Sequence, residues 1–306
     1  MLSLYVIGCG GIGGYLLSEL MENIASIDLD NLDRRISKEG FEYHLENFGK
    51  VVMPSIVDRI VLVDGDTYSP RNALRQGHAS GSKLDNWVSA LDKKAIRKTY
   101  FRTTDIIGYN LYLNPDNMEK VIQRFPGRNP ANTGGCLGHG GACTSEGEIA
   151  GHTYPGYRDM PVIFLCVDNA KTRYEVSKYA ETFNDILVIN GGNEKTWGQV
   201  TVYERRDGIA LDPNLPDLFP NVKADTDLRP DEVDPCTHIA PKHDQVADTN
   251  EIVAVFMRKL FSIWIRGGLN VFGPHKTDRR NDLIIDLETF ESDTLYHPPK
   301  IERKTT

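Results

Sequence analysis

The most informative stretch of this chain is LSLYVIGCGGIGGYLLSELMENI, residues 2–24. Residues 2–8 have the apolar composition of a buried strand, and residues 12–24 have the pattern of the helix that follows. Glycines separate the two, among them Gly8, Gly10, Gly11 and Gly13. Such a turn lets backbone N–H groups at a helix N-terminus approach a phosphate or a ribose without a Cβ in the way. The stretch therefore predicts a nucleotide-binding strand–loop–helix unit, with a tight, closely packed turn as the alternative interpretation.

Further apolar runs along the chain extend this unit into a sheet. Strands are predicted at residues 58–66, 161–169 and 185–193, and the helical pattern AKTRYEVSKYAE lies between the last two. Such alternation of strands and helices is typical of a parallel sheet with crossover helices. Residues 197–205 alternate in polarity and are expected to add an antiparallel strand, and a long helix is expected to end near residue 266. We therefore predict an α/β fold: a doubly wound, Rossmann-like, mostly parallel sheet with an antiparallel extension and a long C-terminal helix.

No clean linker divides the chain, so one domain is predicted. The domain spans residues 1–290, with an insertion at 25–57 that carries its own helix or short strand, an amphipathic helix at 83–95, a mobile glycine-rich loop at 126–158, an extended crossover segment at 207–242, and a frayed tail at 291–306. Glycine and proline clusters mark the loop and the crossover segment, because both residues interrupt regular structure.

Composition excludes several classes of protein. Of the 306 residues, 40% are hydrophobic and 25% are charged, which is a globular mixture rather than that of a disordered chain or a coiled coil. The net charge of −8 argues against a broad basic face for nucleic acid. No apolar run reaches the roughly 18 residues of a membrane span, and the first residues lack a basic leader. Five scattered cysteines suit a reducing compartment, so a cytoplasmic protein is expected.

The second strand ends in two aspartates, Asp64 and Asp66. In a dinucleotide-binding fold the ribose-binding acid follows the glycines by about 20 residues, whereas Asp64 follows Gly8 by 56. Either an insertion intervenes or the dinucleotide interpretation is wrong. The polar and cationic turn that follows contains Arg71, Asn72, Arg75, Gln76 and Lys83. Such a cluster suits a triphosphate whose pyrophosphate leaves better than a nicotinamide cofactor, which carries only a diphosphate.

Three motifs in this order, VIGCGGIGG, DGDTYSPRNALRQ and CVDNAKTR, resemble those of the ubiquitin-activating superfamily of adenylating enzymes. The bacterial members of this superfamily include proteins of the ThiF, MoeB and HesA type. The resemblance covers roughly residues 1–270, and the C-terminal half is particularly similar to compact ThiF-type proteins carried by phages and plasmids. The combination of motifs is much more specific than any one of them.

The resemblance implies a site for ATP and Mg²⁺. In it Asp64 would hold the ribose, Asn72 and Arg75 would contact phosphates, Lys83 would neutralise the triphosphate, and Asp168 would hold Mg²⁺ with support from Arg173. The remaining nucleotide-binding positions would be Gly8, Gly10, Gly11, Gly13, Asp66, Gln76 and Asn169. The catalytic residues would be Arg75, Lys83 and Cys236. The alternatives are solvated surface charges for Arg75 and Lys83, and a helix cap for Asp168.

The resemblance also implies that Cys236 is the acceptor thiol, since the Cys-Thr of DPCTHIAP, just before the long final helix, matches the Cys-Thr of the ubiquitin-activating branch. A cysteine near a helix N-terminus has a lowered pKa and therefore more of the nucleophilic thiolate. The alternative is a buried packing residue. The two Cys-x-x-Cys pairs of the bacterial relatives are missing, and the spacing of Cys136, His139, Cys143 and His152 matches no standard zinc site. No structural zinc is therefore expected.

Taken with the resemblance, these residues imply ATP-dependent adenylation of a C-terminal carboxylate, with release of pyrophosphate. The partner would be a small ubiquitin-like or sulfur-carrier protein that ends in glycine, and the enzyme would be a homodimer. A thioester on Cys236 would follow in one branch of the superfamily, and a thiocarboxylate would form in another. The alternatives are an NAD- or FAD-dependent oxidoreductase, which would bind NADH rather than ATP with magnesium, and a non-catalytic nucleotide-binding scaffold, which would bind without pyrophosphate exchange.

Overall fold

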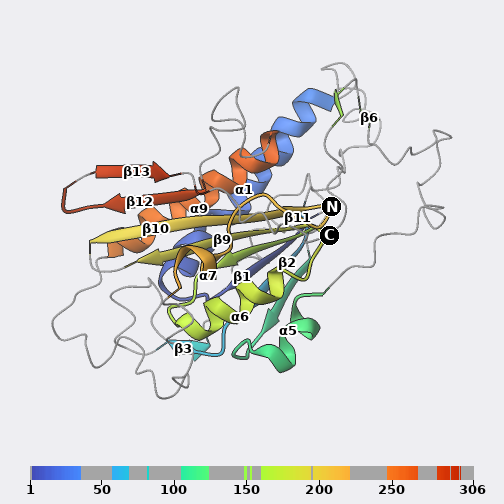
Figure 1. Ribbon diagram of the computed structural model, residues 1–306. Helices are drawn as coiled ribbons and strands as arrows, with labels where there is room; N and C mark the ends of the chain where they lie inside the picture. The colour runs from blue at the N-terminus through green and yellow to red at the C-terminus, as the bar shows by residue number, and fades with distance from the viewer. Residues whose placement is uncertain are drawn as a thin grey trace, which may run out of the picture.

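The computed structural model describes residues 2–35, 57–68, 81–82, 105–123, 148–149, 152–153, 160–193, 196–220, 247–267, 281–289, 291–295 and 297. These residues form the predicted α/β fold around one large mixed sheet, shown in Figure 1. The spatial order of its strands is β5-β2-β1-β8-β9-β10-β12-β13, and the short β11 pairs with β10 at the side.

Five neighbouring strands, from the edge strand β5 to β9, are parallel, and the strands beyond β9 are antiparallel. The parallel strands are β1 (Leu2–Ile7), β2 (Val57–Val63), β5 (Asp105–Tyr109), β8 (Met160–Leu165) and β9 (Ile186–Asn193). The antiparallel strands are β10 (Trp197–Arg206), β11 (Ile209–Ala210), β12 (Asp282–Asp286) and β13 (Glu291–Leu295). The predicted parallel core and antiparallel extension are both confirmed.

Helices cover both faces of the sheet (Figure 1). The long helices α1 (Gly11–Arg35) and α9 (Ala247–Gly267) pack against each other on one face. The shorter helices α5 (Pro115–Val121), α6 (Ala170–Ala180) and α7 (Leu215–Leu218) lie on the other. Because side chains alternate along a strand, β1 contributes to both cores: Leu4 joins the α1 and α9 side, and Tyr5 joins the α5 and α6 side. Every residue of β1 is accordingly buried.

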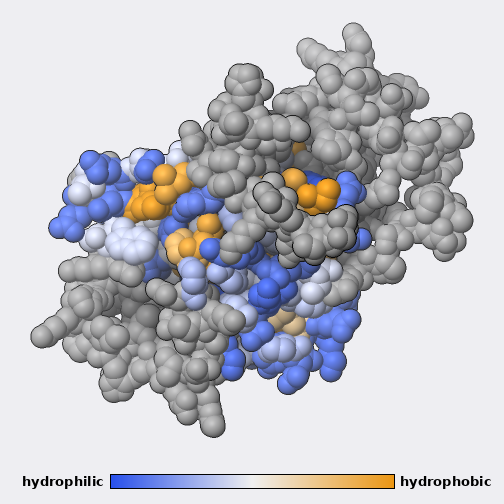
Figure 2. Space-filling model, in the orientation of Figure 1, coloured by the Kyte–Doolittle hydropathy of each residue, from blue (hydrophilic) through white to orange (hydrophobic). Residues whose placement is uncertain are grey.

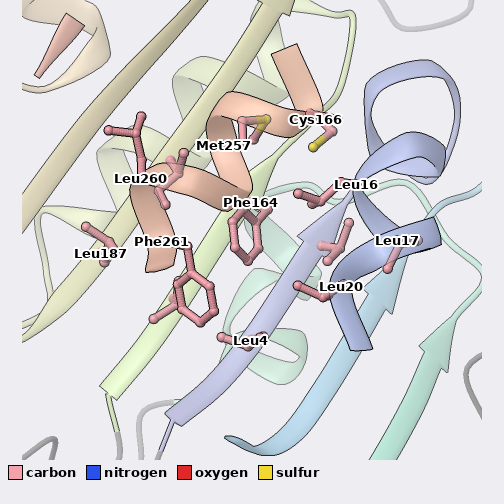
Figure 3. Close-up of a cluster of buried hydrophobic side chains, with 14 of the residues drawn as sticks. Leu4, Leu16, Leu17, Leu20, Phe164, Cys166, Leu187, Met257, Leu260 and Phe261 are labelled. Atoms are coloured by element: carbon pink, nitrogen blue, oxygen red, sulfur yellow. The ribbon is translucent and has the colours of Figure 1, made fainter. Parts of the chain in front are cut away.

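The larger core joins α1 and α9 to the sheet, as Figure 3 shows. Phe164 of β8 meets Phe261 of α9 edge to face, with ring centroids 5.4 Å apart. Helix α9 also comes unusually close to the sheet, because a Cβ at Gly191 would lie only 2.4 Å from Met257 Sδ. A Cβ at Gly198 would lie 2.3 Å from Val253 Cγ2. The glycines of β9 and β10 therefore allow the final helix to lie directly on the strands.

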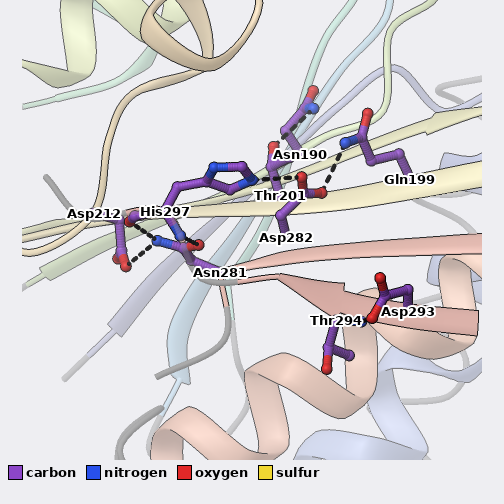
Figure 4. Close-up of polar contacts among 9 residues, drawn as sticks. All are labelled: Asn190, Gln199, Thr201, Asp212, Asn281, Asp282, Asp293, Thr294 and His297. Atoms are coloured by element: carbon purple, nitrogen blue, oxygen red, sulfur yellow. Dashed lines mark hydrogen bonds and ion pairs between the residues drawn. The ribbon is translucent and has the colours of Figure 1, made fainter. Parts of the chain in front are cut away.

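Buried polar residues attach the C-terminal hairpin to the sheet (Figure 4). The Asn281 side chain donates to Asp212 Oδ1 at 3.1 Å and to the His297 carbonyl at 2.8 Å. Asp282 accepts from Gln199 Nε2 at 2.7 Å, and its other oxygen lies 3.1 Å from His297 Nε2. Strand β13 pairs with β12 along its whole length. The prediction of a frayed tail from residue 291 is therefore wrong for residues 291–295.

Other predictions on the fold also need correction. Helix α1 extends to Arg35, so the expected insertion begins within a continuing helix. The expected crossover segment begins with β11 and the one-turn helix α7, and the glycine-rich loop contains the two-stranded pair β6 (Glu148–Ile149) and β7 (His152–Thr153). The short pair β3 (Thr67–Tyr68) and β4 (Gly81–Ser82) was not expected either. The helix expected at 83–95 lies outside the described residues.

The described residues on the face shown in Figure 2 are mainly hydrophilic. On this face, hydrophobic groups form small separate patches between hydrophilic ones. No helix among the described residues is both long enough and apolar enough to cross a membrane.

Candidate functional site

The predicted glycine loop leaves the carboxyl end of β1, between the carboxyl ends of β2 and β8. The Gly8 N–H donates to the Val63 carbonyl of β2 at 2.9 Å, and the Cys166 N–H donates to the Ile7 carbonyl at 2.8 Å. In open α/β sheets, ligands bind at the carboxyl ends of the strands, where the chain order reverses about the first strand. The loop lies at such a position, with β2 on one side of β1 and β8 on the other.

Two glycines in this loop are required by the local geometry. Gly8 has a φ of +89°, and a Cβ there would lie 2.8 Å from the Cys166 carbonyl oxygen. At Gly13 a Cβ would lie only 1.8 Å from the Gly8 carbonyl oxygen. The start of α1 thus packs directly on the loop that precedes it, which is the close approach expected of a tight turn. The first backbone N–H groups of a helix have no partner within the helix, so the start of α1 is a position at which an anion can bind.

Asp64 is buried, and both of its carboxylate oxygens accept hydrogen bonds from backbone N–H groups. The Cys9 N–H donates to Oδ2 at 2.6 Å, and the Asp66 N–H donates to Oδ1 at 2.8 Å. The first bond ties the carboxylate to the glycine loop although the two residues are 55 positions apart. The structure therefore brings together the predicted acid and the predicted loop, and it fixes the orientation of the carboxylate.

Tyr112 is a member of this site that sequence reasoning missed. Its hydroxyl donates to Asp66 Oδ1, and its ring lies against Gly65. The hydrogen bond to Asp66 is the main cause that raises the pKa of Tyr112 to about 12, followed by burial and by the negative charges of Asp66, Asp64 and Asp168. Three predicted acidic residues therefore act on one tyrosine. The only signal in the sequence was its position just after β5, a strand that was itself not predicted.

Asp168 and Asn169 follow β8, and only one of them caps the next helix. Asn169 is the N-cap of α6, and its Oδ1 accepts from the Thr172 N–H at 2.6 Å. Asp168 is exposed, and no other residue in the described part of the chain makes a hydrogen bond or an ion pair with its carboxylate. The alternative interpretation of Asp168 as the helix cap is therefore wrong, and the cap is its neighbour.

Arg173 joins this helix to the next strand. Its guanidinium donates to Asn190 Oδ1 at 2.5 Å and to the Gly191 carbonyl at 2.9 Å. Burial lowers the pKa of Arg173, while the neighbouring Cys166 and Asp168 act in the opposite direction. Burial also raises the pKa of the Cys166 thiol to about 12, so this thiol is neutral at physiological pH. Cys166 therefore lacks the thiolate character of a nucleophile.

The acidic residues of the site could bind a cation only if most of its ligands came from elsewhere, such as water and phosphate oxygens. Among the described residues, no three His, Cys, Asp or Glu side chains form a group that could hold a metal ion. Mg²⁺ typically keeps several waters and takes only one or two carboxylates together with phosphate oxygens. The exposed carboxylate of Asp168 fits that kind of binding.

Several predicted site residues lie outside the described residues. These are Asn72, Arg75, Gln76, Lys83 and Cys236, as well as Cys136, His139 and Cys143 of the glycine-rich loop. His152 lies in β7, but the structure does not describe its side chain. The roles expected for all of these residues stay predictions.

Comparison with known proteins identifies the fold. No protein-family model and no curated protein matches the chain. Among solved structures, Escherichia coli MccB matches with a TM-score of 0.53 at 13% identity, over 97% of this chain and 62% of MccB. PaaA matches with a TM-score of 0.51 at 15% identity, over 97% of this chain and 73% of that chain. The MccB structures include a complex with ATP, and one of the microcin C7 biosynthetic enzyme MccB with N-formylated MccA.

The chain therefore has the doubly wound α/β fold that MccB and PaaA share, with the glycine loop at its switch point. It spans less than two thirds of the MccB chain in that first comparison. At such identities the likeness defines the fold and leaves the activity to be argued from the site.

Proposed function

We propose that this protein is an ATP-dependent adenylating enzyme that activates the C-terminal carboxylate of a peptide or small protein. The main support is the fixed carboxylate of Asp64 beside the glycine loop, together with Asp168, which follows β8 on the other side of β1 and whose carboxylate has no hydrogen bond or ion pair within the described residues. A solved structure of the same fold, MccB, is a complex with ATP. The motif order that resembles the ubiquitin-activating superfamily adds to this support.

In the proposed complex, the ribose hydroxyls donate to the Asp64 carboxylate, whose orientation is already set by two backbone N–H groups. The N–H groups at the start of α1 face the phosphates and favour their negative charge. Asp168 would hold Mg²⁺, which supplies charge neutralisation to the triphosphate when it is bound. Arg75 and Lys83 would act on the same phosphates from the segment that follows Asp66.

The chemical step is an exchange at the α-phosphate of ATP. An oxygen of the substrate carboxylate bonds to the α-phosphorus, and the bond from that phosphorus to the bridging oxygen of the leaving pyrophosphate breaks. The products are an acyl-adenylate and pyrophosphate. Little covalent work falls to the protein, so catalysis depends on positioning and on neutralising the charge that develops.

The substrate is proposed to be a small ubiquitin-like or sulfur-carrier protein, or a peptide, with a C-terminal glycine. One MccB structure contains N-formylated MccA, which supports a small partner of this kind. A homodimer is proposed for the enzyme on the resemblance alone. Cys236 is proposed to accept the acyl group as a thioester after pyrophosphate has left.

ATP–pyrophosphate exchange with a panel of glycine-terminated small proteins and peptides tests the adenylation step. Asp168→Asn should abolish exchange without changing the melting curve, because the carboxylate is exposed and unbonded within the described structure. Asp105→Asn is a matched control, since Asp105 is an exposed aspartate at the opposite end of a parallel strand. Binding of NADH but not of ATP with magnesium would instead support an oxidoreductase.

A non-reducing gel of enzyme, ATP, magnesium and an active partner tests the thiol. Cys236→Ala should leave pyrophosphate exchange intact and remove a reductant-sensitive enzyme–partner band. Cys236→Ser should give a band that resists reductant, because an oxygen ester forms in place of the thioester. A band that persists in Cys236→Ala would refute the role of Cys236, and no band in the parent protein would indicate direct transfer from the adenylate.

A further inference from the structure

Tyr112 combines features that rarely occur together in one side chain. It is 56% exposed, and it is one of four large hydrophobic residues exposed in the described part of the chain. Its backbone is nevertheless fixed, because the Asn117 side chain donates to the Tyr112 carbonyl at 2.9 Å and the next residue, Leu113, is buried. Its hydroxyl is also engaged, because it donates to Asp66 Oδ1. Tyr112 is therefore held in place at the surface rather than free to move.

The residues it contacts form the turn that carries Asp64. A Cβ at Gly65 would lie 2.9 Å from both Cγ and Cδ2 of the Tyr112 ring, so the ring lies directly on the peptide between the two aspartates. The Asp66 side chain accepts from the tyrosine, and the Asp66 N–H donates to Asp64 Oδ1 at 2.8 Å. The tyrosine thus contacts the turn at two points: under its ring and at its hydroxyl.

We propose that Tyr112 is a positioning residue that acts through Asp66 on the carboxylate of Asp64, and so sets the affinity of the site for the two hydroxyls of a nucleotide ribose. The inference rests on the proposed function, in which Asp64 holds the ribose. The Cys9 N–H fixes one oxygen of Asp64 from the side of the glycine loop. The Asp66 N–H fixes the other oxygen, and Tyr112 determines where that N–H lies.

The physical reason is the flexibility of the turn. Gly65 is the central residue between the two aspartates, and a glycine has more backbone freedom to lose than any other residue. Without the tyrosine hydroxyl, the Asp66 side chain loses this donor and the turn has more conformations in which the Asp64 carboxylate points elsewhere. The raised pKa of Tyr112 keeps the hydroxyl protonated at neutral pH, so it stays a donor under working conditions.

The test compares the binding of ATP and of 2′,3′-dideoxy-ATP to the parent protein and to Tyr112→Phe. The variant keeps the ring on Gly65 and removes only the hydroxyl. ATP binding should weaken about tenfold, at the low end for a hydrogen bond to a charged group. Binding of 2′,3′-dideoxy-ATP, which has no hydroxyls for Asp64 to accept from, should change less than about twofold, the usual limit for independent changes.

Tyr179→Phe is the matched control, because it also removes a tyrosine hydroxyl that donates a hydrogen bond, here to the Ile122 carbonyl at 3.3 Å. It should leave both affinities unchanged. In pyrophosphate exchange, Tyr112→Phe should raise the KM for ATP and leave kcat nearly unchanged, since the ribose contact is the same in the ground state and in the transition state. A melting curve of the nucleotide-free variant checks that the fold is intact.

Four outcomes would overturn the inference. Equal losses for ATP and 2′,3′-dideoxy-ATP would mean that Tyr112 acts on the base or on the fold, and no loss for either would mean that its hydroxyl is irrelevant. If the parent protein binds both nucleotides equally well, Asp64 does not bind the ribose hydroxyls, although adenylation would still be possible. A parent protein that binds no ATP would refute the proposed function together with this inference.

Discussion

Gly13→Ala is the substitution whose consequence follows most directly from the structure. The added Cβ would lie 1.8 Å from the Gly8 carbonyl oxygen, where real Cβ atoms essentially never come closer than 3.0 Å. The added Cβ is fixed rigidly to the backbone and the oxygen belongs to it, so no flexible side chain can move aside to relieve the contact. Gly8 itself has a φ of +89°, and the Cys166 carbonyl oxygen lies close to it, only 2.8 Å from where a Cβ would be. Both features limit how far the loop can shift. The start of α1 must therefore move away from β1.

The expected loss is at the upper end for overpacking, about 3 kcal/mol. For a domain of about 300 residues, whose unfolding entropy is about 0.6 kcal/mol/K, that corresponds to a fall in Tm of roughly 5 °C. Thermal unfolding followed by circular dichroism measures the change. Gly192→Ala is the matched control, because a Cβ there would meet only the Arg173 guanidinium, at an ordinary 3.5 Å. This control should lie within about 0.5 kcal/mol of the parent protein. If the Tm of Gly13→Ala equals that of the Gly192→Ala control, the close approach of helix and loop is refuted.

Three further changes test the surroundings of the site. Arg173→Met removes the guanidinium that donates to the Asn190 side chain and the Gly191 carbonyl, and it should lower the free energy of unfolding in urea by about 2–4 kcal/mol. A decrease below about 1 kcal/mol would contradict a stabilising role for these two hydrogen bonds. Cys166 has a folded-state pKa raised from 9.0 to about 12, so its contribution to stability is complete below pH 9 and is lost as the pH rises toward 12; Cys166→Ala should flatten that part of the stability–pH curve, and an unchanged slope would argue against it. Asn114→Ala removes the cap of α5 and should destabilise the protein by about 1 kcal/mol in the same unfolding assay, whereas no effect would mean that the cap is redundant.

The core of the fold could be predicted because the composition of its strands identifies them. Strands β1, β8 and β9 are buried almost throughout, so they appear in the sequence as continuous apolar runs. Strand β13 could not be found in this way. Its sequence, ESDTL, is polar and exposed, and its place depends on backbone pairing with β12, which side-chain patterns do not encode.

The candidate site was predictable where a residue follows a recognisable strand. Asp64 and Asp168 were found for that reason, and the bond from Cys9 to Asp64 brings the first of them to the glycine loop. Tyr112 was missed because the strand that precedes it, β5, is short, partly exposed and contains a glycine. Which of Asp168 and Asn169 caps α6 was also beyond the sequence, because the two residue types are about equally good N-caps.

The topology bears on the choice between ATP and a dinucleotide more directly than the sequence spacing does. The 56 residues between Gly8 and Asp64 suggested a departure from the dinucleotide pattern, yet β2 pairs with β1 in parallel and Asp64 lies beside the loop as in that pattern. The difference lies on the other side of β1. A dinucleotide-binding fold has two parallel βαβαβ halves, one for each nucleotide. Here β8 and β9 are parallel and joined by α6, but the strand after them, β10, returns antiparallel without a crossover helix. The second half is therefore incomplete, and the edge that would bind the second nucleotide is replaced by antiparallel strands under α9. A fold without a complete second half lacks the position for a second nucleotide, which favours the proposal of ATP over a dinucleotide.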